Sequence, residues 1–161
     1  MLGPHPARTP SVSVTGRYAS GGVAEFLSAS WIAEMDRAAR AAPSLAGLGR
    51  EGPLVVEQRV GRADDEVVYH LAFTSEGARV QAGPAATPDL TLVVDAETAR
   101  RLQEGTLNAQ QAAAAGRLKV RGHLGRLRAA GEALRSVEDV FRAVREATTY
   151  PAGREGAAGR Q

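Results

Sequence analysis

The stretch LNAQQAAAAGRLKVRG, residues Leu107–Gly122, decides the fold because a helix pattern and a strand pattern meet in it. Asn108, followed three residues later by Gln111, has the spacing of a capping box, so we expect a helix to begin after Asn108. That helix carries four consecutive alanines and ends at Gly116. The residues RLKVRG then alternate between basic and apolar side chains, which predicts a short strand with one solvated face.

The alanine run Ala112–Ala115 has two interpretations. The alanines could simply be good helix formers that press closely on a sheet. Alternatively, because protein interiors are densely packed, such small side chains could leave space for something else. In that case they would form the wall of an apolar cavity, with the amide of Gln110 or Gln111 as its polar group. Such a cavity suits an apolar ligand with one polar end.

Further strands and helices are expected on both sides of this stretch. Alternating patterns and turn residues predict four earlier strands, at 54–60, 65–73, 77–83 and 88–95, of which the first two form a hairpin. Capping residues and apolar periodicity predict the remaining helices, which follow Ser28, follow Asp95, begin near Leu124 and restart at Ser136. Five short strands and about five helices indicate an α+β fold.

The composition indicates one globular domain with loose ends. The chain has 161 residues, of which 43% are hydrophobic and 24% charged. Residues 1–22 are rich in Pro, Ser, Thr and Gly and are expected to be a flexible leader. Residues 150–161 are expected to be a flexible tail, which leaves 23–149 as the folded domain.

Several classes of site and location are disfavoured by the sequence. There is no cysteine, so disulfides and zinc–thiolate sites are excluded. The three histidines, His5, His70 and His123, show no metal-ligand spacing, and no cofactor is expected. No apolar run has the length of a membrane span, and residues 1–22 lack the apolar core of a secretory signal. We therefore expect a cytoplasmic protein, and its bias toward Arg, Ala and Gly is typical of a bacterium with a GC-rich genome.

Catalysis has little support in the sequence. Tyr69 and His70 are neighbours on a predicted strand and so point to opposite faces. No Ser-His-Asp order and no phosphate-binding loop is present. An enzyme would need His70 or His123 to act on a bound apolar substrate; otherwise His70 is a strand surface residue and His123 begins a helix.

Basic residues gather between positions 117 and 128 with no acidic residue among them: Arg117, Lys119, Arg121, Arg126 and Arg128. One interpretation is a solvated sheet face and helix surface. The other is transient docking to an anionic membrane surface or an acidic partner. Nucleic acid is not expected as a partner, because no aromatic residues alternate with the charges to stack on bases.

The longer stretch PDLTLVVDAETARRLQEGTLNAQQAAAAGRLKVRGHLG, residues 88–125, resembles the core of the sterol carrier protein type 2 domain family. The similarity extends back to FLSASWIAEM and covers about residues 23–145. It implies a five-stranded mixed, mostly antiparallel sheet, covered on one face by helices and enclosing an apolar tunnel. It also implies non-catalytic binding and transfer of sterols, fatty acids or fatty acyl chains.

By position, Gln111 matches a family glutamine near the tunnel, and Leu107 and Leu118 match apolar wall positions. The chain departs from the family pattern at five positions: Ala109, Ala113, Ala114, Arg117 and His123. The alanines at 113 and 114 replace bulky residues, so the family's ligand preference is not carried over. The full set of candidate ligand-binding residues is Trp31, Met35, Leu71, Phe73, Leu102, Leu107, Gln111, Ala112, Ala115, Leu118, Val120 and Leu124.

Trp31 and Met35 have two possible roles, because they could pack the first helix against the core or line the ligand space. Two other functions remain open beside lipid binding. One is an accessory protein or enzyme of lipid or secondary metabolism that holds a hydrophobic substrate in the same pocket. The other is an interaction module that uses the basic surface.

Overall fold

The computed structural model describes residues 24–129 and 131–150, with all of the expected leader and most of the expected tail outside that range. The main sheet has five strands: β2 (Leu54–Gly61), β3 (Glu66–Thr74), β4 (Gly77–Ala82), β5 (Leu90–Asp95) and β6 (Leu118–Gly122). Their order is β4-β3-β2-β5-β6. Only the central pair, β2 and β5, is parallel. The expected five-stranded, mostly antiparallel sheet is therefore confirmed.

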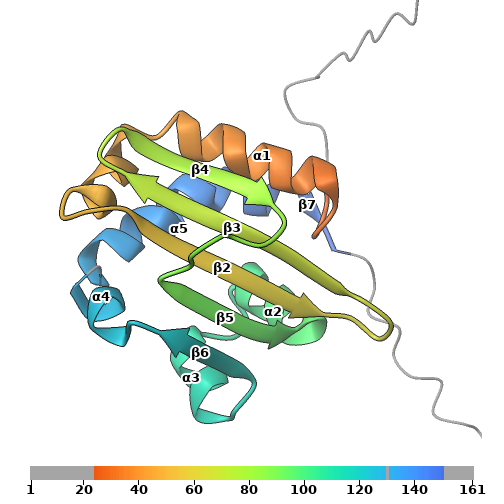
Figure 1. Cartoon of the computed structure of the whole chain (residues 1–161). Coiled ribbons are helices and arrows are strands. Elements are labelled where there is room, and N and C mark those ends of the chain that lie inside the picture. The colour runs from red at the N-terminus through yellow and green to blue at the C-terminus, as the bar shows by residue number, and fades with distance from the viewer. Residues whose placement is uncertain (1–23, 130, 151–161) are drawn as a thin grey trace, which may run out of the picture.

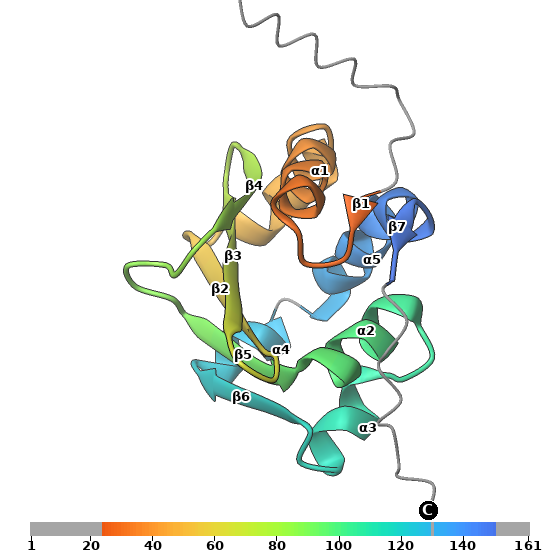
Figure 2. The same ribbon diagram turned by 90° about the vertical axis from the view of Figure 1, so that its right-hand side faces the viewer.

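The helices lie on one side of this sheet, as Figure 2 shows with the sheet seen edge-on. They are α1 (Ala29–Arg40), the 3-10 helix η1 (Pro43–Gly49), α2 (Ala96–Glu104), α3 (Ala109–Ala114), α4 (Leu124–Ala129) and α5 (Gly131–Glu146). Three of the four predicted N-caps are confirmed. Ser28, Asp95 and Asn108 each accept a hydrogen bond from a backbone N–H three residues later, and Asn108 forms the full capping box with Gln111.

The helix expected after Ser28 ends at Arg40, ahead of Pro43, and the chain then forms the short 3-10 turn η1, which the sequence did not predict. Gly49 makes this turn possible, because a Cβ at that position would lie within 2.5 Å of the Thr74 backbone. The expected helix start at Ser136 is wrong, since α5 passes through it without a break. A Ser-x-x-Asp pattern also fits a helix interior, where the apolar spacing continues.

Two short strands join the ends of the described chain. β1 (Ala24–Glu25) pairs in parallel with β7 (Thr148–Thr149), and the Phe26 N–H donates to the Thr149 carbonyl at 2.9 Å. The indole N–H of Trp31 donates to the Thr148 hydroxyl at 3.2 Å. These bonds hold the end of α5 beside α1.

The edge strand β4 is covered by α1 through one carboxylate. Asp36 accepts hydrogen bonds from the Val80 N–H at 2.8 Å and from Arg79 Nε at 3.1 Å, and Arg40 Nε lies 3.1 Å away. Burial alone would raise the pKa of Asp36, but the Val80 bond and the two cations outweigh it and hold the pKa below its ordinary value. An edge N–H that would otherwise be open is thereby satisfied.

The opposite face of the sheet is crossed by residues 83–89, which lead from β4 to β5 (Figure 2). Glu57 is 3% exposed beneath this loop, where it accepts hydrogen bonds from the Ala85 N–H at 2.9 Å and Arg59 at 2.7 Å. Asp89, at the end of the loop, accepts from the Val55 N–H at 2.8 Å and from Arg126 at 2.7 Å. These carboxylates therefore fix the crossing loop and have structural roles.

Candidate functional site

The helix-facing side of the sheet is buried unevenly. The register places Val56, Gln58 and Val60 of β2 beside Leu90, Leu92 and Val94 of β5, and pairs Leu92 with Val120 of β6. Leu90, Val60 and Val94 are buried. The residues between them are only half-buried: Val56, Gln58, Leu92 and Val120. We call these four residues the β2–β6 strip.

The position of the strip's strands makes its exposure informative. β2 and β5 are interior strands with a neighbour on each side, so their side chains should be covered wherever helices pack on them. Leu92 is not among the residues packed against the main core, although it lies in the middle of β5. The helices therefore leave this part of the sheet incompletely covered.

Two helices of the covered face also carry half-buried apolar residues. Leu102 lies on α2, which approaches β5 and β2, and Val137 and Val140 lie on α5. The main contacts of α5 are with α1, η1 and α4 rather than with a strand. α2 and α5 thus contribute half-buried apolar side chains that pack against the main core.

Two buried polar atoms make no hydrogen bond of good geometry within the described chain: Gln103 Nε2 on α2 and the hydroxyl of Tyr150. The Tyr150 ring packs on Phe26 at 5.4 Å. Burial and the negative charge of Glu104 raise the pKa of Tyr150, and they outweigh Arg145 and the nearby Thr148 side chain, which lower it. Unpaired buried polar groups are costly, so these two atoms are candidates to meet the polar end of a ligand.

The residues predicted to bind ligand occupy three different environments: the core beneath α1, the half-buried α2–β6 side of the domain, and the exposed surface. Trp31, Met35, Leu71 and Phe73 are 0–6% exposed in the core beneath α1. Trp31 contacts Phe26 and Tyr69 edge-on, with ring centroids 5.1 and 5.5 Å apart. Four residues are half-buried on the α2–β6 side of the domain: Leu102, Leu107, Leu118 and Val120.

The alanine helix differs from both interpretations of its sequence. Ala112 is fully buried against β6, but Ala113, Ala114 and Ala115 are exposed. Gln111 is exposed as well, and its side-chain oxygen accepts from the Asn108 N–H at 3.5 Å. Its amide therefore has a local role at the helix start, in the capping box that the spacing of Asn108 and Gln111 predicted.

Five residues of the region were missed: Val56, Gln58, Leu92, Gln103 and Tyr150. One signal was present, since Gln58 is a polar residue in a strand register otherwise occupied by Leu54, Val56 and Val60. Its side chain accepts a hydrogen bond from the Tyr69 hydroxyl at 2.9 Å. Nothing in the sequence distinguishes Leu92 from Leu90.

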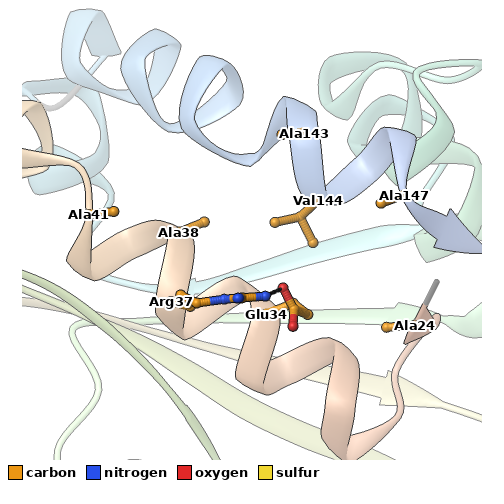
Figure 3. A pocket seen from close by; sticks show the side chains of 8 residues that line it. All are labelled: Ala24, Glu34, Arg37, Ala38, Ala41, Ala143, Val144 and Ala147. Carbon is orange, nitrogen blue, oxygen red and sulfur yellow. Dashed lines mark hydrogen bonds and ion pairs between the residues drawn. The ribbon is translucent and has the colours of Figure 1, made fainter. Parts of the chain in front are cut away.

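A separate groove lies between α1 and α5, with a volume of about 360 Å³ (Figure 3). It is lined by Ala24, Glu34, Arg37, Ala38, Ala41, Ala143, Val144 and Ala147. The ion pair between Glu34 and Arg37 is its polar part. The residues at 34, 37, 38 and 41 recur at helical spacing, so this groove is the seam where two helices with small side chains meet.

A second hollow of about 400 Å³ lies on the other face of the sheet, lined by Gly61, Glu66, Val93, Val94, Asp95, Gly116, Arg117 and Lys119. Burial would raise the pKa of Asp95, but its bonds to Thr98 and the nearby Arg117 lower it. Asp95 thus serves as a charged N-cap of α2, and mixed charges surround this hollow.

The two histidines among the described residues, His70 and His123, have ordinary surroundings. His70 Nδ1 lies 2.9 Å from the Gly83 carbonyl and Nε2 lies 3.2 Å from Gln81 Oε1, while His123 is exposed. Within residues 24–129 and 131–150, no three His, Cys, Asp or Glu side chains gather as metal ligands. In the same residues, no helix has the length and apolarity to cross a membrane.

Comparison with known proteins identifies the fold. The chain is similar to an apo sterol carrier protein 2 from Yarrowia lipolytica, with 21% identity, 68% of this chain and 88% of that chain covered, and a TM-score of 0.51. It is also similar to a conserved hypothetical protein of Thermus thermophilus described as possibly a sterol carrier protein. There the identity is 20%, the coverage 81% and 95%, and the TM-score 0.56.

The chain is also similar to a crystal structure of sterol carrier protein 2, with 20% identity and a TM-score of 0.54. The match covers 76% of this chain and 98% of that chain. No curated protein matches this chain. Residues 56–135, from β2 to the first part of α5, match the family described as the SCP-2 sterol transfer family. The family match and the shared fold place the chain in the SCP-2 sterol transfer family.

Proposed function

We propose that this chain binds an apolar lipid against the β2–β6 strip and transfers it without a chemical step. The observation that carries this proposal is the half-burial of Val56, Leu92 and Val120 on the covered face of the sheet. A sheet interior that its own helices leave partly bare offers apolar surface to a ligand. Family membership supports lipid binding in general.

The chemical class of the ligand follows from this lining. An acyl chain or a sterol would cover the half-buried side chains of the strip and those of Leu102, Val137 and Val140. Burial of a dozen methylene groups contributes roughly 10 kcal/mol before association costs. Those costs are several kcal/mol or more, so micromolar or tighter binding needs no strong polar site.

The polar end of the lipid would meet Gln103 and Tyr150. An amide N–H and a phenol hydroxyl can both donate to an oxygen of the ligand. This pair takes the role that the sequence suggested for Gln110 or Gln111, because Gln111 is engaged at the start of α3. A sterol hydroxyl, a fatty acid or an ester carbonyl would each supply such an oxygen.

Ligand access would use the seam between α1 and α5. This seam is lined largely by alanine and so buries little apolar surface per residue. At one end of the seam, the β1–β7 pair and the Trp31–Thr148 hydrogen bond hold the end of α5 beside α1. A small separation of α5 would therefore expose the strip without disrupting the core beneath α1.

Native mass spectrometry of the full chain purified from cells tests the proposal. We expect a lipid adduct that disappears on solvent extraction and returns when a fatty acid or a sterol is added. A protein that is empty as isolated, and that binds neither probe after extraction, would refute lipid binding.

A further inference from the structure

One apolar residue departs from the burial pattern of the rest of the fold. Leu124, the first residue of α4, is 56% exposed and is the only large hydrophobic side chain exposed in the described part of the chain. Its neighbour Gly125 has open space around it, with no atom within 4 Å of the position that a Cβ would take there. Leu124 therefore does not line the interior, contrary to its expected role in ligand binding.

Three exposed basic residues lie within five positions of this leucine in the sequence. Lys119 and Arg121 alternate on the solvent face of β6, which is an edge strand, and Arg128 lies one helical turn beyond Leu124 on α4. All three are exposed and none forms an ion pair within residues 24–129 and 131–150. We call Lys119, Arg121, Leu124 and Arg128 the β6–α4 surface.

The other basic residues of this segment are already engaged. Arg126 donates to Asp89 at 2.7 Å and to the Gly52 carbonyl at 3.3 Å, so it fixes the crossing loop. Arg117 lies close enough to Asp95 to lower the pKa of that carboxyl, and it lines the hollow on the outer face together with Lys119. Of the five cations predicted to form a docking surface, Lys119, Arg121 and Arg128 form no ion pair within the described residues.

The two edges of the sheet differ in a way that supports a functional role for these cations. At β4, α1 and the Asp36 carboxylate cover the strand and neutralise Arg79. At β6, no described acidic side chain pairs with Lys119 or Arg121. Unpaired cations beside an exposed apolar side chain are the combination that a bilayer interface recognises.

We propose that the β6–α4 surface docks the protein on anionic phospholipid bilayers, with Leu124 inserted at the interface and the three cations on the lipid head groups. The occupant is a bilayer rather than a nucleic acid, since no aromatic side chain lies on this surface to stack on bases. Docking goes beyond lipid binding in the interior and does not require a bound ligand.

Each residue of the β6–α4 surface is expected to contribute separately to the affinity for an anionic bilayer. A cation near a charged bilayer contributes roughly five-fold in affinity. Insertion of one leucine contributes about tenfold. Because the bilayer contact is largely electrostatic, it weakens as salt shortens the Debye length below its value of about 8 Å at physiological ionic strength.

Co-sedimentation of the full chain with vesicles tests this surface. Vesicles of phosphatidylcholine alone are compared with vesicles that also contain phosphatidylserine. We expect salt-sensitive binding to the second kind only, a loss of more than tenfold in Lys119→Glu/Arg121→Glu, and a loss of about tenfold in Leu124→Ser.

The matched control is Arg62→Glu/Arg142→Glu, which changes the net charge by the same amount at two exposed ion pairs elsewhere. Equal loss in this control would show a general charge effect and overturn the proposal, as would unchanged binding of Leu124→Ser. Fatty acid binding without vesicles is measured for each variant. It should equal that of the wild type, so a failure of docking is distinct from a failure of lipid binding.

Discussion

The covered face of the sheet divides into two regions that its helices treat differently. Beneath α1 and η1, the side chains of Trp31, Leu45 and Phe73 are at most 2% exposed and fill the interior. Elsewhere on the same face, Val56 and Leu92 are half-buried although their strands are interior. The first region is closely packed, while the second leaves apolar side chains partly exposed and is the proposed ligand site.

The difference appears even within one strand. Leu90 and Leu92 are the same residue type, two positions apart on the same face of β5, yet Leu90 is 1% exposed and Leu92 is half-buried. Helix placement, rather than the strand itself, therefore decides which residues contribute to stability. The predictions below test this difference between the closely packed and the half-buried region, from the largest expected effect to the smallest.

The first prediction compares Leu90→Ala with Leu92→Ala. Removing Leu90 leaves a cavity in a packed region and should cost about 2–5 kcal/mol of unfolding free energy. Leu92 has less packing to lose, so its truncation should cost about 1 kcal/mol. Urea unfolding followed by circular dichroism measures both values. Equal costs would show that Leu92 is packed as tightly as Leu90 and would remove the proposed site.

The second prediction fills the strip. Leu92→Trp should lower the affinity for a fluorescent fatty acid by more than tenfold, with little change in stability, because the indole occupies space over the sheet. Leu90→Trp is the matched control and should destabilise the protein by roughly 1–3 kcal/mol through overpacking. Undiminished lipid binding by a folded Leu92→Trp variant would place the ligand elsewhere.

The sequence predicted the features that short-range patterns determine. Ser28, Asp95 and Asn108 were identified as caps because a cap and its partner lie three residues apart. Strand faces followed from alternation, as in Tyr69, Leu71 and Phe73, which are all buried. The family resemblance supplied the five-stranded, mostly antiparallel sheet, which alternation alone does not give.

The site was harder to predict because it depends on long-range packing. Trp31 and Phe73 were predicted to bind ligand as large apolar residues, but the same property places them in the core. Gln111 was chosen for its amide, which instead completes a capping box. Leu92 became a candidate only when the structure showed it half-buried, and Gln103 only when the structure showed its amide nitrogen buried without a hydrogen-bond partner.

The third prediction concerns the two unpaired polar atoms. Gln103→Leu and Tyr150→Phe should leave the empty protein as stable as the wild type, or up to about 1 kcal/mol more stable, because each removes a buried group without a partner. The affinity for a fatty alcohol should fall about five-fold. Gln110→Leu, at an exposed amide on α3, is the control and should change neither quantity. Weaker stability with unchanged affinity would show that both groups serve only the fold.

The last prediction tests whether the charge of Asp36 helps to hold α1 on the edge strand β4. The pKa of Asp36 is below its ordinary value in the folded protein, so the carboxylate stabilises the fold above about pH 4 and loses this effect as pH falls through the folded pKa. Asp36→Asn should cost about 1 kcal/mol at neutral pH, because the ion pairs to Arg40 and Arg79 are lost.

The cost should be smaller at an acidic pH below the folded pKa than at neutral pH, because the wild-type carboxyl is then protonated itself. Urea unfolding at the two pH values measures this change, with Asp139→Asn, at an exposed ion pair, as a control that should vary little. If the cost of Asp36→Asn were the same at both pH values, the charge of Asp36 would not fasten α1 to β4. The edge would then be held by the apolar contacts of α1 alone, and the contrast with the open β6 edge would no longer be electrostatic.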